Sequence, residues 1–262
     1  MFRLSLFALA LLAGAALPAS ANEAIRCTLL VDAGSGQTLV REGQCDRRVS
    51  PASTFKVAIS LMGYDSGILV DQKTPRLPFR PGYVDWLPEW RSATDPGAWM
   101  KHSVVWYSQQ VTTRLGLQRF QSYLDRFDYG NRDASGNPGK HDGLTEAWLS
   151  SSLKISPDEQ AVFLRKLVNR TLPVSRKAVD MTGAIMRYPA LRNGWELYAK
   201  TGTGAEPGSP QHGWLVGWTT DGKRTVVFAR LAQDDKRKDG PRAGLRVRDA
   251  FIKELPALLE KL

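Results

Sequence analysis

The chain carries Ser-Pro-Ala-Ser-Thr-Phe-Lys at residues 50–56, and this stretch predicts a helix whose first turn holds reactive side chains. Ser50 is a favourable N-cap, and Pro51 is a residue type that the first helical position accepts. Apolar side chains then recur at helical spacing up to Met62, so one face of the helix is expected to be buried. Ser53 would lie in the first turn, where free backbone N–H groups and the helix dipole stabilise negative charge.

Lys56 follows Ser53 by one helical turn, which predicts that its amine can take the proton of the serine hydroxyl. An ammonium group cannot act as a base, so the pKa of Lys56 must fall below the ordinary lysine value of about 10.4. Burial lowers a lysine pKa because an apolar environment disfavours the charged form. The apolar residues that we expect around this amine are Phe55, Val105, Trp148 and Leu149.

Further motifs follow in order along the chain. A Ser-x-x-Lys arises by chance about once in a chain of this length, but a Lys-Thr-Gly arises in only a few per cent of such chains. The two together form the signature of penicillin-recognising serine enzymes. The motifs after Ser53 are Ser103-Val104-Val105, Tyr129-Gly130-Asn131, Trp148-Leu149, Lys200-Thr201-Gly202 and His212-Gly213-Trp214-Leu215-Val216-Gly217-Trp218.

From about Ala24 to about Leu259, these motifs make the chain resemble the class D β-lactamases, or oxacillinases. The resemblance implies hydrolysis of the β-lactam ring of penicillins through an acyl-enzyme at Ser53, and hence resistance to these antibiotics. It also implies that carbon dioxide or bicarbonate carboxylates Lys56, and that the resulting N6-carboxylysine is the general base. The indole N–H of Trp148 is suited to donate to this group. No other cofactor and no metal is implied.

The resemblance assigns roles to further residues. Ser103 would relay a proton toward the leaving nitrogen, and Lys200 with Thr201 would hold the substrate carboxylate. The backbone N–H of Thr203 would complete an oxyanion hole with that of Ser53, although many relatives carry an aromatic residue in place of this threonine. Other residues expected to line the substrate site are Val105, Tyr129, Trp148, Leu149 and Gly202.

An arginine of the last predicted helix is expected to bind the substrate carboxylate as well. Phe251 and Leu255 follow Arg248 at helical spacing, in the phase associated with the family, whereas they do not follow Arg246 in this way. The local context Gly244-Leu245-Arg246 nevertheless resembles the family more closely. We therefore favour Arg248, with Arg246 as the alternative.

Three of these motifs also have plainer interpretations. Ser103 on its own is typical of a helix cap, and Tyr129-Gly130-Asn131 is typical of a turn. Trp148 is equally typical of ordinary core packing. The three histidines, His102, His141 and His212, share no metal-ligand spacing, so no metal site is predicted.

The first 21 residues have the pattern of an export signal. Arg3 precedes the apolar stretch 4–17, which is too short to span a bilayer, and Ala19-Ser20-Ala21 is a small-residue cleavage site. We expect residues 22–262 to form one periplasmic catalytic domain without a membrane anchor. The formal net charge of +10 comes from basic residues interleaved with acidic ones, which argues against nucleic-acid binding.

The predicted fold class is α+β. Strands are expected at 28–31 and 37–41, and Cys27 and Cys45 flank this hairpin, so a disulfide is predicted, with two free thiols as the alternative. Residues 71–185 are expected to be largely helical, with a helix capped by Ser156. The strands predicted at 195–200, 213–219 and 225–232 precede a terminal helix at 246–262. The expected architecture is a five-stranded antiparallel sheet flanked by terminal helices, with a mostly helical lobe inserted mid-chain.

Two other functions share the same motifs. A D,D-peptidase or transpeptidase of the cell wall uses them, but such proteins usually carry an anchor or extra domains. A non-hydrolytic β-lactam sensor is acylated without turnover, but it must signal across a membrane, and no apolar run after the export signal is long enough to cross one. We therefore favour the β-lactamase. Both a monomer and a homodimer are compatible with the sequence.

Overall fold

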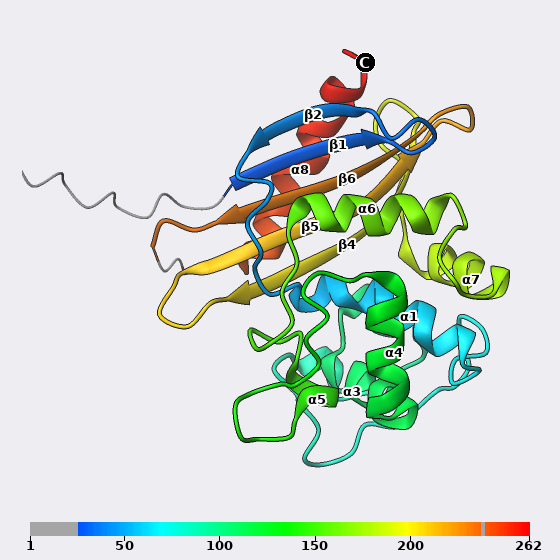
Figure 1. The fold of residues 1–262 in the computed structure, drawn as a ribbon, viewed down its shortest axis with the longest axis vertical. Helices are drawn as coiled ribbons and strands as arrows, with labels where there is room; N and C mark the ends of the chain where they lie inside the picture. The colour runs from blue at the N-terminus through cyan, green and yellow to red at the C-terminus, as the bar shows by residue number, and fades with distance from the viewer. Residues whose placement is uncertain (1–25, 237–238) are drawn as a thin grey trace, which may run out of the picture.

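The computed structural model describes residues 26–236 and 239–262 of the chain, and Figure 1 shows their arrangement. The predicted export signal at residues 1–21 lies outside the described residues. Between β2 and β3 the chain forms a mostly helical lobe, which lies against one edge of a twisted sheet (Figure 1). The predicted α+β architecture with an inserted helical lobe is confirmed.

The sheet is antiparallel and has six strands in the order β2-β1-β6-β5-β4-β3, so the prediction of five strands was wrong. The additional strand has only two residues and pairs with the start of β4. A strand this short shows no alternation of polar and apolar residues, so no pattern indicates it. The strands are β1 (Arg26–Asp32), β2 (Thr38–Gly43), β3 (Arg187–Tyr188), β4 (Glu196–Ala205), β5 (Gln211–Thr220) and β6 (Thr225–Gln233).

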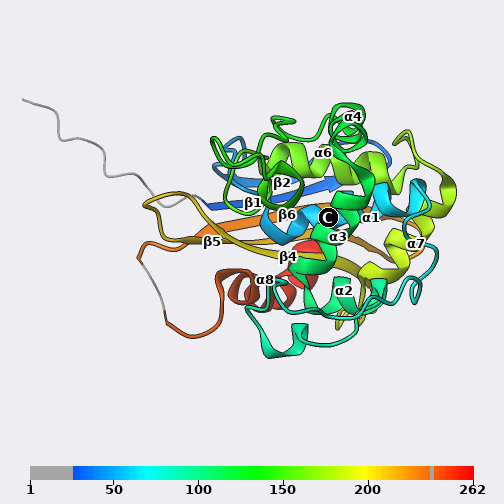
Figure 2. The ribbon, with the colours of Figure 1, turned by 90° about the horizontal axis from the view of Figure 1, so that it is seen from below.

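Helices cover both faces of the sheet. Figure 2 shows α8 on one side of the sheet and α6 on the other. The 3-10 helices of the lobe are η1 (Ala52–Phe55) and η2 (Pro88–Trp90). The α-helices are α1 (Lys56–Asp65), α2 (Pro96–His102), α3 (Val105–Leu115), α4 (Leu117–Phe127), α5 (Gly143–Glu146), α6 (Pro157–Val168), α7 (Arg176–Met186) and α8 (Ala243–Leu259).

The two faces of the sheet bury separate sets of apolar side chains. In β6, Val226 and Phe228 join the core under α8, whereas Val227 and Ala229 join the larger core shared with the lobe. Because both faces are buried, β6 has a nearly continuous apolar sequence instead of an alternating one. Phe251 on α8 completes the smaller core.

Local signals place some helix starts correctly and one incorrectly. Ser156 caps α6 as predicted: its hydroxyl accepts from the N–H of Glu159, whose carboxylate accepts in turn from the N–H of Ser156. Ser50, by contrast, caps no helix. The 3-10 turn η1 comes before α1, and the hydroxyl of Ser50 donates instead to the carbonyl oxygen of Trp148, 2.7 Å away. A partner distant in sequence has replaced the local cap.

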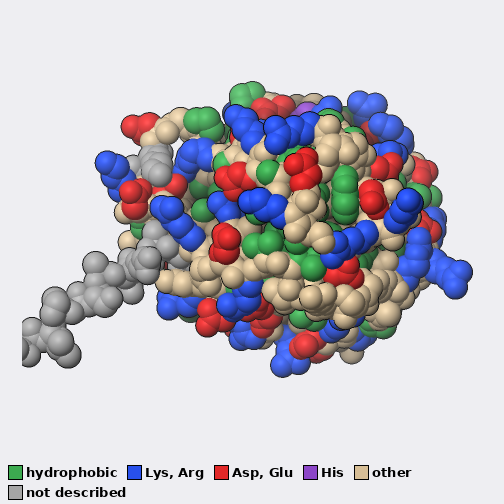
Figure 3. Space-filling model, turned by 90° about the horizontal axis from the view of Figure 1, so that it is seen from above, with side chains coloured by type: hydrophobic (Ala, Val, Ile, Leu, Met, Phe, Trp, Pro, Cys, Tyr) green, Lys and Arg blue, Asp and Glu red, His purple; other side chains and the backbone are tan. Residues whose placement is uncertain are grey.

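The hairpin of β1 and β2 carries the predicted disulfide between Cys27 and Cys45, with a Cα–Cα distance of 5.1 Å. The terminal helix begins at Ala243, three residues before the predicted start. None of the helices in residues 26–236 and 239–262 combines the length and the apolar character that crossing a membrane requires. On the face shown in Figure 3, basic side chains are interspersed with acidic ones.

Candidate active site

A cleft of about 200 Å³ lies where β4 and the start of α8 meet the helical lobe. Eight of the predicted site residues line it: Ser53, Ser103, Val105, Leu149, Thr201, Gly202, Thr203 and Arg248. Prediction from sequence missed Trp86, Glu89, Tyr188 and Arg242, which line it too. A larger hollow of about 440 Å³ lies beside α7 and the strands that carry Tyr198 and Trp218, but none of the predicted site residues lines it.

Ser53 and Lys56 form the reactive pair. The Nζ of Lys56 lies 3.1 Å from the hydroxyl oxygen of Ser53, which is within hydrogen-bond distance. Lys56 is completely buried, at 0% exposure. Burial, together with the positive charges of Lys200 and Arg242, holds the pKa of Lys56 well below its ordinary value. This shift favours the neutral form of an amine that lies directly beside the serine.

A second lysine and serine face each other across the cleft. The Nζ of Lys200 on β4 donates to the hydroxyl of Ser103 at 3.0 Å, and also approaches the carbonyl oxygen of Thr201 at 3.0 Å. Ser103 follows α2 in a left-handed conformation with φ of 59°, so it does end a helix, but its hydroxyl faces the cleft. Burial, then Arg242 and Arg248, lower the pKa of Lys200 to about 7.

The absence of side chains at two glycines lets the layers of the site meet. A Cβ on Gly202 would lie 2.9 Å from the carbonyl oxygen of Pro51, so β4 packs directly on the turn that carries Ser53. A Cβ on Gly244 would lie 2.3 Å from the carbonyl oxygen of Gly202. The N–H of Gly244 donates to the hydroxyl of Thr203 at 2.8 Å, which joins α8 to β4.

Trp148 is completely buried and does not line the cleft, so the prediction that it lines the substrate site was wrong. Its ring packs on Phe55, the neighbour of Lys56, with centroids 5.5 Å apart. The indole N–H is buried and has no hydrogen-bond partner among the described residues. Because a buried unpaired donor costs free energy, this N–H fits an acceptor that the protein atoms do not supply. A carboxylate on the nitrogen of Lys56 has the chemistry of such an acceptor.

Tyr129 does not line the cleft, and the prediction that it does was wrong. Its ring is completely buried between Phe55 and Phe163, each with its centroid 5.1 Å away. The turn signal at Tyr129-Gly130-Asn131 was correct, but a turn signal does not determine which side chain faces a cavity. The aromatic packing around Tyr129 decides its direction.

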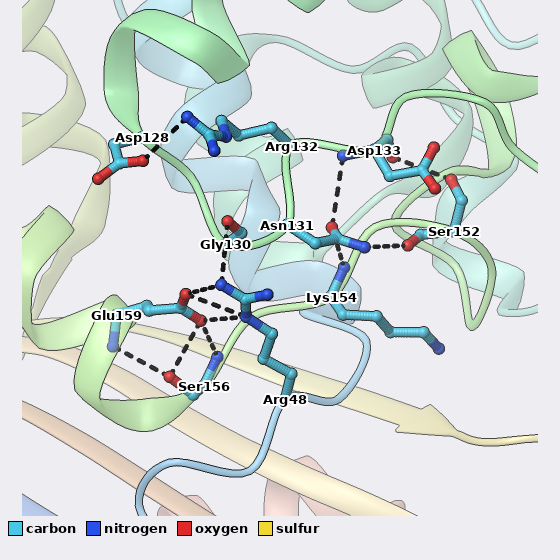
Figure 4. Close-up of polar contacts among 10 residues, drawn as sticks. All are labelled: Arg48, Asp128, Gly130, Asn131, Arg132, Asp133, Ser152, Lys154, Ser156 and Glu159. Carbon is cyan, nitrogen blue, oxygen red and sulfur yellow. Dashed lines mark hydrogen bonds and ion pairs between the residues drawn. The ribbon is translucent and has the colours of Figure 1, made fainter.

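Asn131 of the same motif holds the loop that follows Trp148 (Figure 4). Its side-chain amide donates to the carbonyl oxygen of Ser152 at 2.8 Å, and its side-chain oxygen accepts from the N–H of Lys154 at 2.9 Å. Gly130, at φ of +54°, lies against the same loop: a Cβ there would be 2.0 Å from the carbonyl oxygen of Lys154. Through Gly130 and Asn131, the motif therefore supports the loop that follows Trp148.

The structure separates the two candidate arginines. Arg248 lines the cleft, whereas Arg246 forms an ion pair with Asp234. Arg242, which sequence reasoning did not consider, lies at the start of α8 and also lines the cleft. Only the packing of α8 on β4 brings it there. No pattern in the sequence indicates that Arg242, a basic residue just before a helix, lines this cleft.

Within the described ranges, no group of three or more His, Cys, Asp and Glu side chains could hold a metal ion. His212 is buried, and its Nε2 lies 2.9 Å from the carbonyl oxygen of Ser50. Its burial lowers its pKa. His102 lines the cleft, but among the described residues it belongs to no group of three possible metal ligands.

Comparison with known proteins places the chain among penicillin-recognising enzymes. Residues 26–256 match the penicillin binding protein transpeptidase domain. The β-lactamase OXA-9 of Klebsiella pneumoniae is 44% identical over 249 residues, covering 90% of this chain and 89% of that protein. The β-lactamase OXA-1 of Escherichia coli is 42% identical over 216 residues, covering 78% and 75%. The crystal structure of the OXA-427 class D β-lactamase is 49% identical, with a TM-score of 0.85 over 90% of this chain and 99% of that one.

Proposed function

Because this chain belongs to the class D β-lactamases, we propose that it hydrolyses the β-lactam ring of penicillins through an acyl-enzyme at Ser53 and so confers resistance. The observation that carries this proposal is the 3.1 Å contact between the Ser53 hydroxyl and the completely buried amine of Lys56. A base on this side chain can activate the serine as a nucleophile.

In the acylation step, the Ser53 oxygen bonds to the carbonyl carbon of the ring while the general base on the side chain of Lys56 takes the hydroxyl proton. The carbon–nitrogen bond of the ring breaks, and Ser103 gives its proton to the leaving nitrogen. Lys200, 3.0 Å from Ser103, replaces that proton. The backbone N–H groups of Ser53 and Thr203 would stabilise the oxyanion that develops on the carbonyl oxygen.

In the deacylation step, water attacks the ester on Ser53, and a base must take the water proton. Carbon dioxide, when bound as a carbamate on Lys56, supplies a carboxylate that serves as this base. The residues that would hold the carboxylate are Lys56 itself and Trp148, whose buried N–H has no partner among the described residues. The ring of Trp148 packs on Phe55, the residue next to Lys56 in the sequence.

The substrate carboxylate would bind Lys200, Thr201 and Arg248, which lie on β4 and on the adjoining face of α8. Losing one hydrogen bond to a charged group costs about 1.5–3 kcal/mol. Val105 and Leu149 line the cleft on its apolar side and would contact the rest of the substrate.

For localisation we propose the periplasm, with residues 1–21 removed as an export signal and residues 22–262 as the catalytic domain. The disulfide between Cys27 and Cys45 supports an oxidising compartment.

Hydrolysis of a chromogenic β-lactam tests the proposal. Sustained turnover at steady state is expected of a β-lactamase. A single burst, equal to the amount of enzyme and followed by no turnover, would instead indicate a sensor or a D,D-peptidase.

A further inference from the structure

Ser50 is a buried junction of three segments that are distant in sequence. Its side chain is inaccessible to solvent, at 0% exposure. Its hydroxyl donates to the carbonyl oxygen of Trp148 at 2.7 Å and accepts from the N–H of Ser150 at 2.9 Å. The backbone N–H of Ser50 donates to the carboxylate of Glu206 at 2.9 Å.

The carbonyl oxygen of Ser50 binds β5. The indole N–H of Trp214 donates to it at 3.0 Å, and the Nε2 of His212 lies 2.9 Å from it. The N–H, the carbonyl and the hydroxyl of this residue are thus all satisfied by tertiary contacts. These contacts come from three parts of the fold, namely the loop with Trp148 and Ser150, Glu206, and β5, so they restrain Ser50 against several segments at once.

Ser50 connects Lys56 and Trp148, the two residues proposed to act in the deacylation step. Ser50 lies just before the 3-10 turn η1, which leads to Lys56, and its hydroxyl donates to the carbonyl oxygen of Trp148 itself. The unpaired indole N–H belongs to this tryptophan. The hydroxyl of Ser50 therefore links the backbone of Trp148 to the segment that leads to Lys56.

We propose that Ser50 is a positioning residue that fixes Trp148 relative to Lys56 and thereby sets how fully Lys56 is carboxylated. This inference rests on the proposed function. In the carboxylation step, the neutral amine of Lys56 bonds to the carbon of carbon dioxide and loses one proton to solvent. The product keeps its place only if a donor meets its oxygens, because an unpaired buried charge is strongly disfavoured.

Removing the hydroxyl would take two hydrogen bonds, those with Trp148 and Ser150, from the Trp148 loop. The far end would stay fixed, because Asn131 holds Ser152 and Lys154 independently of Ser50. The indole N–H could then shift away from the carboxylate. A displacement of about 1 Å at such a site can cost about a hundredfold in rate. Ser53 lies 3.1 Å from Lys56 on the same turn, whereas the attacking water has no such covalent link to the base, so acylation is expected to suffer less than deacylation.

The test compares Ser50→Ala with Ser60→Ala. Ser60 is a matched control because it lies on α1, is also completely buried, and loses a buried hydrogen bond to Thr182 of 2.8 Å. Carboxylation is measured by carbon-13 NMR at increasing concentrations of labelled bicarbonate. We expect Ser50→Ala to require about ten times more bicarbonate for half occupancy, the lower end of what loss of a supporting contact costs. The bicarbonate concentration for half occupancy in Ser60→Ala should equal that of the wild-type protein, even if both variants melt at a lower temperature.

Two further variants separate positioning from folding. Ser50→Thr keeps the hydroxyl and should restore the affinity for bicarbonate, and Ser50→Cys keeps the size of the side chain with a weaker donor and should fall between. The inference would be overturned if Ser50→Ala, Ser60→Ala and the wild-type protein all had the same affinity for bicarbonate. That result would leave the proposed function intact. A wild-type protein that turns over fully with no carbamate signal would overturn the inference and the carboxylated base, but would leave hydrolysis of the β-lactam at Ser53 intact.

Discussion

The amine of Lys200 lies 3.0 Å from the hydroxyl of Ser103, and the two residues are separated by 97 positions in the sequence. Lys200 belongs to β4 and Ser103 ends α2, so this one contact joins the sheet to the lobe across the cleft. With Ser53 and Lys56 on the adjoining turn, two lysine–serine pairs border the cleft, and each presents its serine to it. One pair suits removal of a proton from the nucleophile, and the other suits delivery of a proton to the leaving group.

Ser53→Ala should abolish the covalent adduct with penicillin, because no other hydroxyl lies within hydrogen-bond distance of the Lys56 amine among the described contacts. Intact-protein mass spectrometry after incubation with benzylpenicillin measures the adduct. Ser60→Ala serves as the control and should still be acylated, since its hydroxyl bonds to Thr182 away from the cleft. An adduct that persists on Ser53→Ala would remove this serine from the mechanism.

Arg248→Ala should raise KM for penicillins and reduce kcat/KM by about tenfold to over a hundredfold, as expected for loss of a charged hydrogen bond. Arg246→Ala is the matched control, since its guanidinium pairs with Asp234 outside the cleft lining. Steady-state kinetics of both variants decide between the two arginines. A larger loss in Arg246→Ala than in Arg248→Ala would assign the carboxylate to Arg246.

Arg242→Gln should move the acid limb of the pH profile of kcat/KM to higher pH. Lys56 must be neutral to act as a base, so activity falls as the pH drops through its lowered pKa. Burial lowers that pKa first, then Lys200, then Arg242. Removing the Arg242 charge therefore raises the pKa, and more of the amine is protonated at a given acidic pH.

The profile is measured with a penicillin between mildly acidic and neutral pH. Arg246→Gln is again the control, because Arg246 is not among the groups that shift the pKa of Lys56. An unchanged acid limb in Arg242→Gln would show that this arginine does not act on the base.

Trp148→Phe should leave the aromatic packing on Phe55 largely intact but remove the unpaired indole N–H. We expect deacylation to slow by about 10²–10⁴-fold, the range of general-base catalysis, so that the acyl-enzyme accumulates. Stopped-flow kinetics show this as a burst followed by slow turnover. If added bicarbonate restores turnover, the N–H stabilises a carbamate; if deacylation is unchanged, the indole serves packing alone.

Signals confined to neighbouring residues predicted much of the fold. The Ser156 cap, the β1–β2 hairpin with its disulfide and the apolar runs of β4, β5 and β6 depend on local geometry and on burial, which the order of residues records directly. The two-residue strand β3 escaped prediction because it is too short to show a period. Its pairing depends on where β4 lies.

The sequence by itself determined the reactive pair, because Ser53 and Lys56 lie one turn apart and their contact is local. Only the tertiary structure decided what surrounds them. Packing buries Tyr129 in the core. It places Arg242 and Arg248 in the cleft, while Arg246 pairs with Asp234. The Ser50 hydroxyl donates to the carbonyl oxygen of Trp148 and does not cap a helix. The orientations and partners of these side chains depend on contacts between segments that are distant in sequence, and such contacts leave no periodic pattern in the chain.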